Sequence, residues 1–124
     1  MKPEDLPPAP DTDFNLLLDR LGGDIELVRE LVDLYIVEYP KQLADLQSAV
    51  ASRDLRRVQQ AAHKIKGTAK NFAAAPAEKS ARALEETKEF GDGAAISEMT
   101  NRLSNELRRL QSTLEEVSSR HDPQ

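Results

Sequence analysis

The amino-acid sequence predicts an all-α protein, an antiparallel four-helix bundle with a short extra helix at its N-terminal end. Apolar residues recur every three or four positions along four long segments, which is the period of helices that pack in bundles. Aromatic residues make up only 4% of the 124 residues, so the core must consist of aliphatic side chains, which favour packed helices over sheets. Short turns rich in glycine, proline or aspartate separate the segments.

The short helix is predicted to begin at Asp13 and to end at Gly22 and Gly23. Asp24 is placed to cap the next helix, whose apolar positions are Ile25, Val28, Leu31, Val32, Tyr35 and Tyr39. Pro40 has no backbone donor and clashes with the preceding turn, so we expect a kink or a break there. The helix is then expected to resume through Leu43, Leu46 and Val50.

Asp54 is predicted to cap the third segment, whose apolar side chains are Leu55, Val58, Ala62, Ile65, Ala69 and Phe72. Pro76 suits the first turn of the following alanine-rich helix, which we expect to run to about Phe90. A turn at Gly91–Gly93 leads into the last helix, from about Ala94 to Ser118. Its apolar stripe is Ile96, Met99, Leu103, Leu107, Leu110, Leu114 and Val117.

The bundle is therefore expected to span residues 13–118. Residues 1–12 hold four of the seven prolines and read as a flexible linker or tail, either tethered to something larger or a natural N-terminus. Residues 119–124, including His121, read as a disordered tail.

Composition excludes several classes of function. The net charge of −5 argues against a dedicated nucleic-acid binder. The absence of cysteine rules out disulfides, thiolate metal sites and a cysteine nucleophile. No apolar run approaches the roughly 18 residues of a membrane span, and no apolar leader opens the chain. We expect a cytoplasmic protein that does not contact the membrane and holds no metal.

His63 lies midway along the third segment, outside its apolar stripe. Successive helical residues rotate by about 100°, so a polar and basic set shares its face: Arg56, Gln59, Gln60, Lys66, Gly67 and Lys70. No carboxylate is among these helical neighbours, and the face suits an anion. Glycine inside a helix costs about 1 kcal/mol relative to alanine. Gly67 either leaves room beside the imidazole or permits close helix packing.

A neutral imidazole is a nucleophile that can accept a phosphoryl group on a ring nitrogen, and lysine suits phosphoryl oxygens. Phosphoryl transfer asks a protein mainly for positioning and charge neutralisation. An exposed histidine with a nearby cation and steric clearance meets these needs. A surface histidine near lysines is also common without any function.

The string AAHKIKGTAKNFAA, residues 61–74, resembles the signature of histidine-containing phosphotransfer (HPt) domains, A-H-x-L-K-G-[ST]-[AS]-x-x-[LIF]-G-A. The matching residues are Ala62, His63, Ile65, Lys66, Gly67, Thr68, Ala69, Phe72 and Ala74. Ala73 stands where the family has glycine, which bears on the turn into the next helix and on the fit of a partner. The resemblance covers about residues 13–118, including SARALEE downstream.

This resemblance implies a phosphocarrier of a multistep two-component phosphorelay, without kinase activity of its own. His63 would accept a phosphoryl group from an aspartyl phosphate on a receiver domain and pass it to another receiver. Lys66 would steady the phosphoryl oxygens and Gly67 would leave room for them. The helical wheel adds Lys70 as a further stabilising cation.

Candidate receiver contacts on the same face are Gln59, Gln60 and Lys70. No cofactor is expected in this chain, because the family's Mg²⁺ sits in the receiver partner. We expect a monomer, either a free carrier or part of a hybrid sensor kinase. Two alternatives stay open: a helical adaptor module without the chemistry, and the phosphoacceptor and dimerisation region of a histidine kinase, which is usually a two-helix hairpin.

Overall fold

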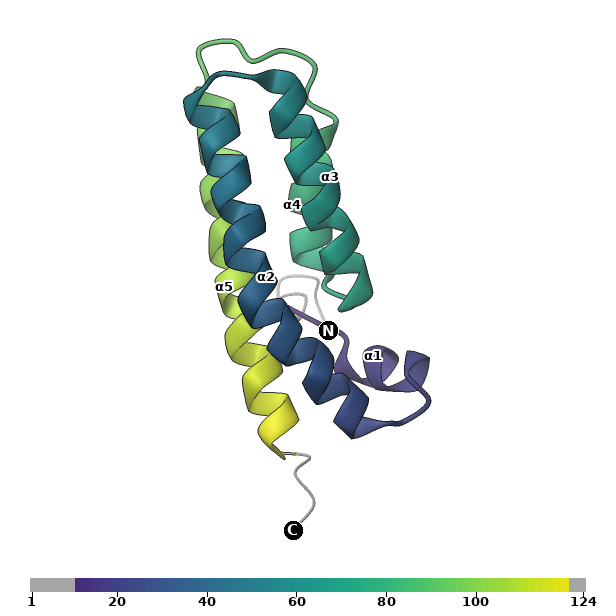
Figure 1. The fold of residues 1–124 in the computed structure, drawn as a ribbon. Helices are drawn as coiled ribbons and strands as arrows, with labels where there is room; N and C mark the ends of the chain where they lie inside the picture. The colour runs from purple at the N-terminus through teal and green to yellow at the C-terminus, as the bar shows by residue number, and fades with distance from the viewer. Residues whose placement is uncertain (1–10, 121–124) are drawn as a thin grey trace, which may run out of the picture.

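The computed structural model describes residues 11–120, which form five helices and, over that range, no strand. These are α1 (Phe14–Arg20), α2 (Ile25–Ala51), α3 (Leu55–Asn71), α4 (Ala75–Glu85) and α5 (Ala94–Arg120). In Figure 1 α2 to α5 run alternately up and down, while α1 lies beside the lower part of α2. The long helices pack in the order α2, α3, α4, α5 and back to α2, which confirms the predicted bundle with its short extra helix.

The predicted helix starts are confirmed by their caps. The carboxylates of Asp13, Asp24 and Asp54 each accept a hydrogen bond from the backbone N–H three residues later, at 3.0, 3.2 and 3.1 Å. Each bond satisfies a donor that the first turn of a helix would otherwise leave unpaired. The N-terminal ends of α1, α2 and α3 therefore follow from local sequence.

The core is the meeting point of the predicted apolar stripes. In α3 the buried side chains are Val58, Ala62, Ile65 and Ala69, and in α5 they include Ile96, Leu103, Leu107, Leu110 and Leu114. Tyr35 is buried among them and stacks on Tyr39, with a ring-centroid distance of 4.7 Å. Since these residues fill one side of α3, the opposite side of that helix is left for solvent or a partner.

Pro40 does not break α2, which is continuous over Ile25–Ala51, although its ribbon bends along its course (Figure 1). Just before Pro40, the Tyr35 hydroxyl donates to the Leu107 carbonyl at 2.8 Å, and the Tyr39 hydroxyl donates to Gln111 Oε1 at 2.6 Å. These bonds fasten the segment to α5. The tertiary contacts outweigh the loss of one helical hydrogen bond, so of the two outcomes expected at Pro40, a kink or a break, the structure excludes the break.

The expectation that the fourth helix runs to Phe90 was also wrong, because α4 ends at Glu85. The chain beyond it is held by side chains from elsewhere. Gln59 donates to the Thr87 carbonyl at 2.7 Å. The Arg53 guanidinium lies over the Phe90 ring, 4.5 Å from its centroid, and donates to the Gly91 carbonyl at 2.7 Å. These contacts draw the segment away from the α4 axis and toward the start of α5.

The end of the predicted linker contacts the bundle. Thr12 is buried and its hydroxyl donates to the Phe72 carbonyl at 2.5 Å, while the backbone N–H of Asp13 donates to the Ala73 carbonyl at 2.9 Å. The remainder of the predicted linker, residues 1–10, and residues 121–124 with His121 lie outside the described residues. At the other end α5 continues to Arg120, two residues past the predicted bound.

Candidate functional site

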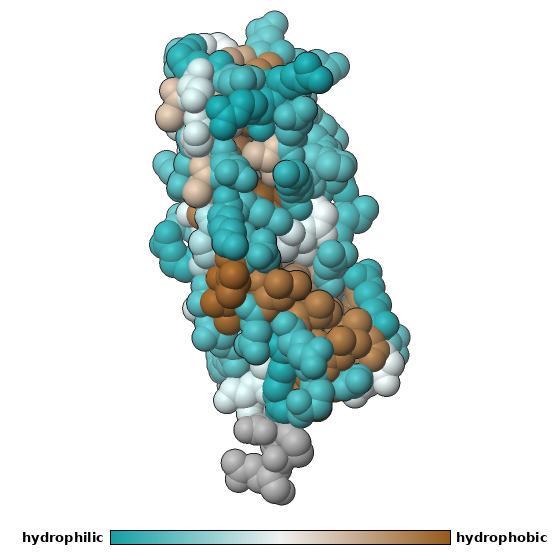
Figure 2. Space-filling view, in the orientation of Figure 1, coloured by the Kyte–Doolittle hydropathy of each residue, from teal (hydrophilic) through white to brown (hydrophobic). Residues whose placement is uncertain are grey.

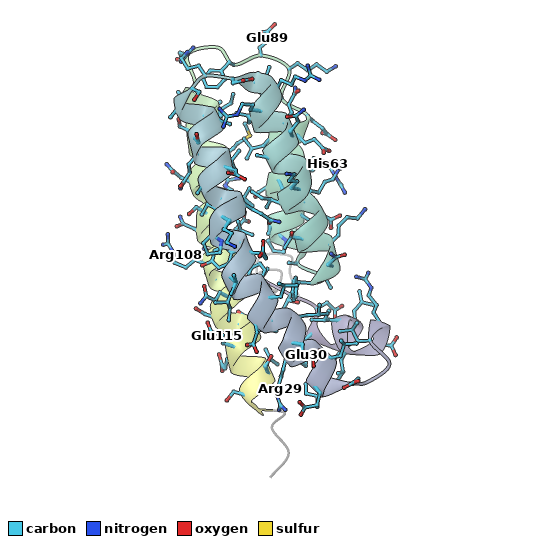
Figure 3. The ribbon with its side chains drawn as sticks, in the orientation of Figure 1. Arg29, Glu30, His63, Glu89, Arg108 and Glu115 are labelled. Atoms are coloured by element: carbon cyan, nitrogen blue, oxygen red, sulfur yellow. The ribbon has the colours of Figure 1, made fainter. Side chains whose placement is uncertain are left out.

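His63 lies at the middle of α3 on the side turned away from the core. Its side chain is 70% exposed, whereas Ala62 beside it is fully buried. Figure 3 shows it on the stretch of α3 that faces outward. The apolar period of the helix therefore places the imidazole where a partner can reach it.

A carboxylate from the neighbouring helix joins His63 to Lys66. Glu85, the last residue of α4, contacts His63 Nδ1 through Oε2 and Lys66 Nζ through Oε1, the latter at 2.5 Å. The Lys66 and Glu85 side chains are only 19% and 23% exposed. Along α3 itself no carboxylate is among the helical neighbours of His63, as the sequence indicated. Glu85 comes from α4 and was not predicted.

This contact decides which ring nitrogen is free. The hydrogen bond from Lys66, and after it the one from His63, holds the pKa of the Glu85 carboxyl below its ordinary value, so the group is ionised at neutral pH. An ionised carboxylate only accepts hydrogen bonds, so the proton between the two groups belongs to Nδ1. In the neutral ring the lone pair then lies on Nε2, the nitrogen that does not contact Glu85.

Gly67 faces open space. A Cβ built on it would meet no atom within 4 Å outside its own stretch of helix. Close packing of another helix, one of the two explanations that the sequence left open, is therefore excluded for the described residues. Among the described residues nothing offsets the cost of a mid-helix glycine, about 1 kcal/mol, so clearance for an approaching group and simple tolerance of the glycine are the explanations that remain.

The two predicted glutamine contacts lie with His63 in one groove. This histidine groove has a volume of about 620 Å³ and is lined by Asp45, Arg57, Gln59, Gln60, Ala61, His63 and Lys64. Gln60 is exposed, but Gln59 is half-buried and bonded to Thr87. Lys70 is exposed one turn beyond Lys66 and does not line the groove. The structure thus groups Gln60 with His63 and leaves Lys70 apart.

Ala73 explains why the related motif has glycine at this position. Its φ angle is +50°, in the left-handed region that favours glycine. Its N–H donates to the Lys70 carbonyl at 3.0 Å, and the N–H of Ala74 donates to the Ala69 carbonyl at 2.9 Å. This is the Schellman arrangement that ends a helix, so the requirement here is conformational.

An apolar patch on α1 and α2 was not predicted. Its large exposed side chains are Leu16, Leu27, Leu34 and Val37. Figure 2 shows apolar surface gathered over the lower part of α2 and over α1. Beside it a groove of about 510 Å³ reaches Thr68 and Asn71 at the end of α3. The sequence does contain a signal for this patch. The segment LVDLYIV, residues 31–37, holds more apolar residues than a single buried stripe of a helix requires.

Among the residues that the structure describes, no group of three or more histidine, aspartate and glutamate side chains could hold a metal ion. Over the same range no helix combines the length and the apolar character needed to cross a membrane.

A comparison with protein families identifies the class. The model of the Hpt domain family matches residues 30–118, so the chain belongs to this family of phosphotransfer domains. It is accordingly a phosphocarrier of the phosphorelay type, and receiver domains are the partners with which such domains work. No curated protein matches the chain in direct sequence comparison.

Two solved structures share the fold. Histidine-containing phosphotransfer protein B (HptB) from Pseudomonas aeruginosa superimposes with a TM-score of 0.81 at 19% identity, over 92% of this chain and 99% of that one. The HPT domain of a sensor hybrid histidine kinase from Shewanella superimposes with a TM-score of 0.72 at 17% identity, over 91% and 97%. These likenesses confirm the bundle and its short extra helix.

Proposed function

We propose that His63 is the phosphoacceptor of this carrier. Its Nε2 takes a phosphoryl group from an aspartyl phosphate on one receiver domain and passes it to an aspartate on another. The observation that carries the proposal is the 70% exposed imidazole, held by Glu85 so that Nε2 is free, at the histidine of the HPt-like string. The other histidine, His121, lies outside the described residues.

Lys66 supplies the positive charge that the phosphoryl oxygens require. Its ammonium lies one helical turn from His63 and is held next to the imidazole by their shared partner Glu85. Three N–H donors on a compact cation suit phosphoryl oxygens, and the open space at Gly67 gives those oxygens room. Lys70, one further turn away and exposed, adds charge to the approach path of an anion rather than a direct contact.

The receiver docks on the face that holds the histidine groove. Gln60 is an exposed contact beside His63, while Gln59 contributes through its hold on the 86–93 segment. The apolar patch on α1 and α2 supports a protein partner, because exposed apolar patches on soluble domains commonly mark such interfaces.

The remaining parts of the reaction belong to the partners. The Mg²⁺ that transfer requires sits in the receiver, and no cofactor is needed in this chain. The carrier has no kinase activity and is phosphorylated only by transfer, either as a free cytoplasmic monomer or within a hybrid sensor kinase. Four helices of one chain complete the bundle, which supports a monomer over the two-helix dimerisation region of a kinase.

Transfer from a radiolabelled phosphorylated receiver tests the proposal. The wild-type chain should gain acid-labile, alkali-stable label within the time that a receiver needs to lose it, and His63→Gln should gain none. Gln60→Ala should weaken transfer without abolishing it. Label on His63→Gln, or no label on the wild type with any receiver of the host, would contradict the proposal and favour the adaptor alternative.

A further inference from the structure

A row of side chains on α5 leads from the first described residue to a groove. Asp11 accepts a hydrogen bond from the Thr113 hydroxyl at 3.1 Å, and its carboxylate lies 3.6 Å from Arg109 Nε. Those two α5 residues share one face of the helix with Glu106 and Arg102, since the steps along the row are four, three and four residues. Asp11 is therefore held about one helical turn from Glu106.

Glu106 and Arg102 border a groove between α4 and α5. This α4–α5 groove has a volume of about 460 Å³ and is lined by small or apolar residues of α4 together with longer side chains of α5, among them Ala75, Pro76, Ala83, Met99, Arg102 and Glu106. The helices pack in the order α2, α3, α4, α5, so the groove lies on the opposite side of the bundle from the histidine groove. An occupant of the α4–α5 groove leaves His63 exposed.

Glu106 has an unmet need at this groove. The residue is only 9% exposed, and its Oε1 is buried without a hydrogen-bond partner in the described part of the chain. Leaving a buried polar atom unpaired is costly, and more so when it belongs to a carboxylate. The α4–α5 groove therefore calls for a hydrogen-bond donor beside Glu106.

We propose that residues 6–10, the sequence Leu-Pro-Pro-Ala-Pro, occupy the α4–α5 groove as a polyproline II strand, with the backbone N–H of Ala9 donating to the Glu106 carboxylate. Three of these five residues are proline, whose fixed φ angle favours that conformation. Proline has no backbone N–H, so Ala9 and Leu6 carry the only backbone donors of the stretch. The proposal is independent of the role of His63.

The lengths of strand and helix agree with this placement. From the contact between Asp11 and Arg109, a polyproline II strand reaches Ala9 after about 6 Å, and Glu106 lies about 4.5 Å along α5. The same count brings Leu6 to about 16 Å and Met99 to about 15 Å. The donor of Ala9 therefore comes level with the carboxylate, and the Leu6 side chain comes level with the apolar Met99.

The charges of the segment also match the groove. Glu4 and Asp5 precede Leu6, and Arg102 is an exposed cation on the groove's border. The ion pair between Asp11 and Arg109 shows the same combination two turns further along α5. Leu6 and the prolines cover apolar surface at the same time, which favours docking through the hydrophobic effect.

Backbone NMR relaxation of the full-length protein tests the proposal. The Leu6 and Ala9 amides should have order parameters of about 0.8, close to those of the helices, whereas a free tail gives values below about 0.6. In Glu106→Ala the acceptor is gone, so both values should fall below about 0.6. The matched control is Glu98→Ala, which removes an exposed carboxylate of α5 outside the groove and should keep the wild-type values.

A second variant leaves the groove itself unchanged. Ala9→Pro removes the N–H and retains the polyproline II backbone, so the Leu6 order parameter should again fall below about 0.6. Thermal unfolding checks that each variant is folded, and Ala9→Pro tests the contact even where Glu106→Ala does not fold. Wild-type values below about 0.6 at both amides, or a Leu6 amide that stays ordered in Ala9→Pro, would overturn the proposal. Groove resonances that shift with protein concentration beside a mobile tail would assign the groove to a second copy and overturn it as well.

Discussion

Replacing Ala73 with glycine should stabilise the fold. Ala73 adopts a φ of +50°, and the left-handed conformation costs an L-residue roughly 1–2 kcal/mol. Glycine removes that strain but gives the unfolded chain more freedom, which takes back about 0.5–1 kcal/mol. The net gain is about 0.5–1 kcal/mol. For a domain of this size it corresponds to a rise in melting temperature of roughly 2–6 °C.

Urea and thermal unfolding followed by far-UV circular dichroism measure this change. The matched control is Ala44→Gly, at an exposed position in the middle of α2 where the backbone is helical. That substitution should destabilise the protein by about 0.5–1 kcal/mol, so the two variants should move in opposite directions. An Ala73→Gly protein that unfolds at or below the wild-type midpoint would refute the reasoning.

Three further predictions concern the site. Lys66→Ala should slow phosphoryl transfer at least about tenfold, as the loss of a preorganised cationic donor does; its stability cost should stay within about 1 kcal/mol, and Lys79→Ala, an exposed control on α4 outside the histidine groove, should match the wild type in transfer assays. Gly67→Ala should transfer faster than Gly67→Leu, since only the longer side chain fills the open space; equal rates for the two would remove the clearance argument. Because the pKa of Glu85 is lowered in the folded state, the ionised carboxylate stabilises the fold above its unfolded-state pKa, and this stabilisation is lost as pH falls through the folded-state pKa. In denaturation series, the free energies of unfolding of wild type and Glu85→Gln should therefore converge in acid. A difference that stays constant with pH would contradict this.

The fold was predictable because its information is local and repeated. Asp13, Asp24 and Asp54 cap helices with bonds that span three residues, and the apolar period marks the buried side of each helix. The end of α4, which was predicted wrongly, and the continuity of α2 at Pro40, which the sequence left open, have a common origin. The end of α4 depends on Arg53 and Gln59, and the continuity of α2 at Pro40 is supported by bonds to α5. Propensity within one segment carries no signal of contacts made by another.

The residues of the site also fall into two groups, those that a single helix brings together and one that comes from a neighbouring helix. His63, Lys66 and Gly67 lie on one helical face, so a wheel drawn from the sequence brings them together. Glu85 required a second step, the pairing of two antiparallel helices across the turn at Ala73. His63 and Glu85 are about equally far from that turn in opposite directions, so they come to the same level of the helix pair. A hairpin register drawn at the sequence level could have identified this carboxylate.

Gly67 and Ala73 show that two glycine positions of one motif answer to different physical demands. At Gly67 the backbone is helical and a Cβ would fit, so the demand that we propose for the missing side chain is clearance for an approaching partner. At Ala73 the backbone is left-handed, and glycine would relieve strain without touching His63. Arg53 occupies the same kind of turn after α2, with a φ of +54°, so this fold already accommodates a side chain in that conformation. We therefore expect the departure at Ala73 to cost stability without affecting phosphoryl transfer, and a bulky side chain at Gly67 to impair transfer with little effect on stability.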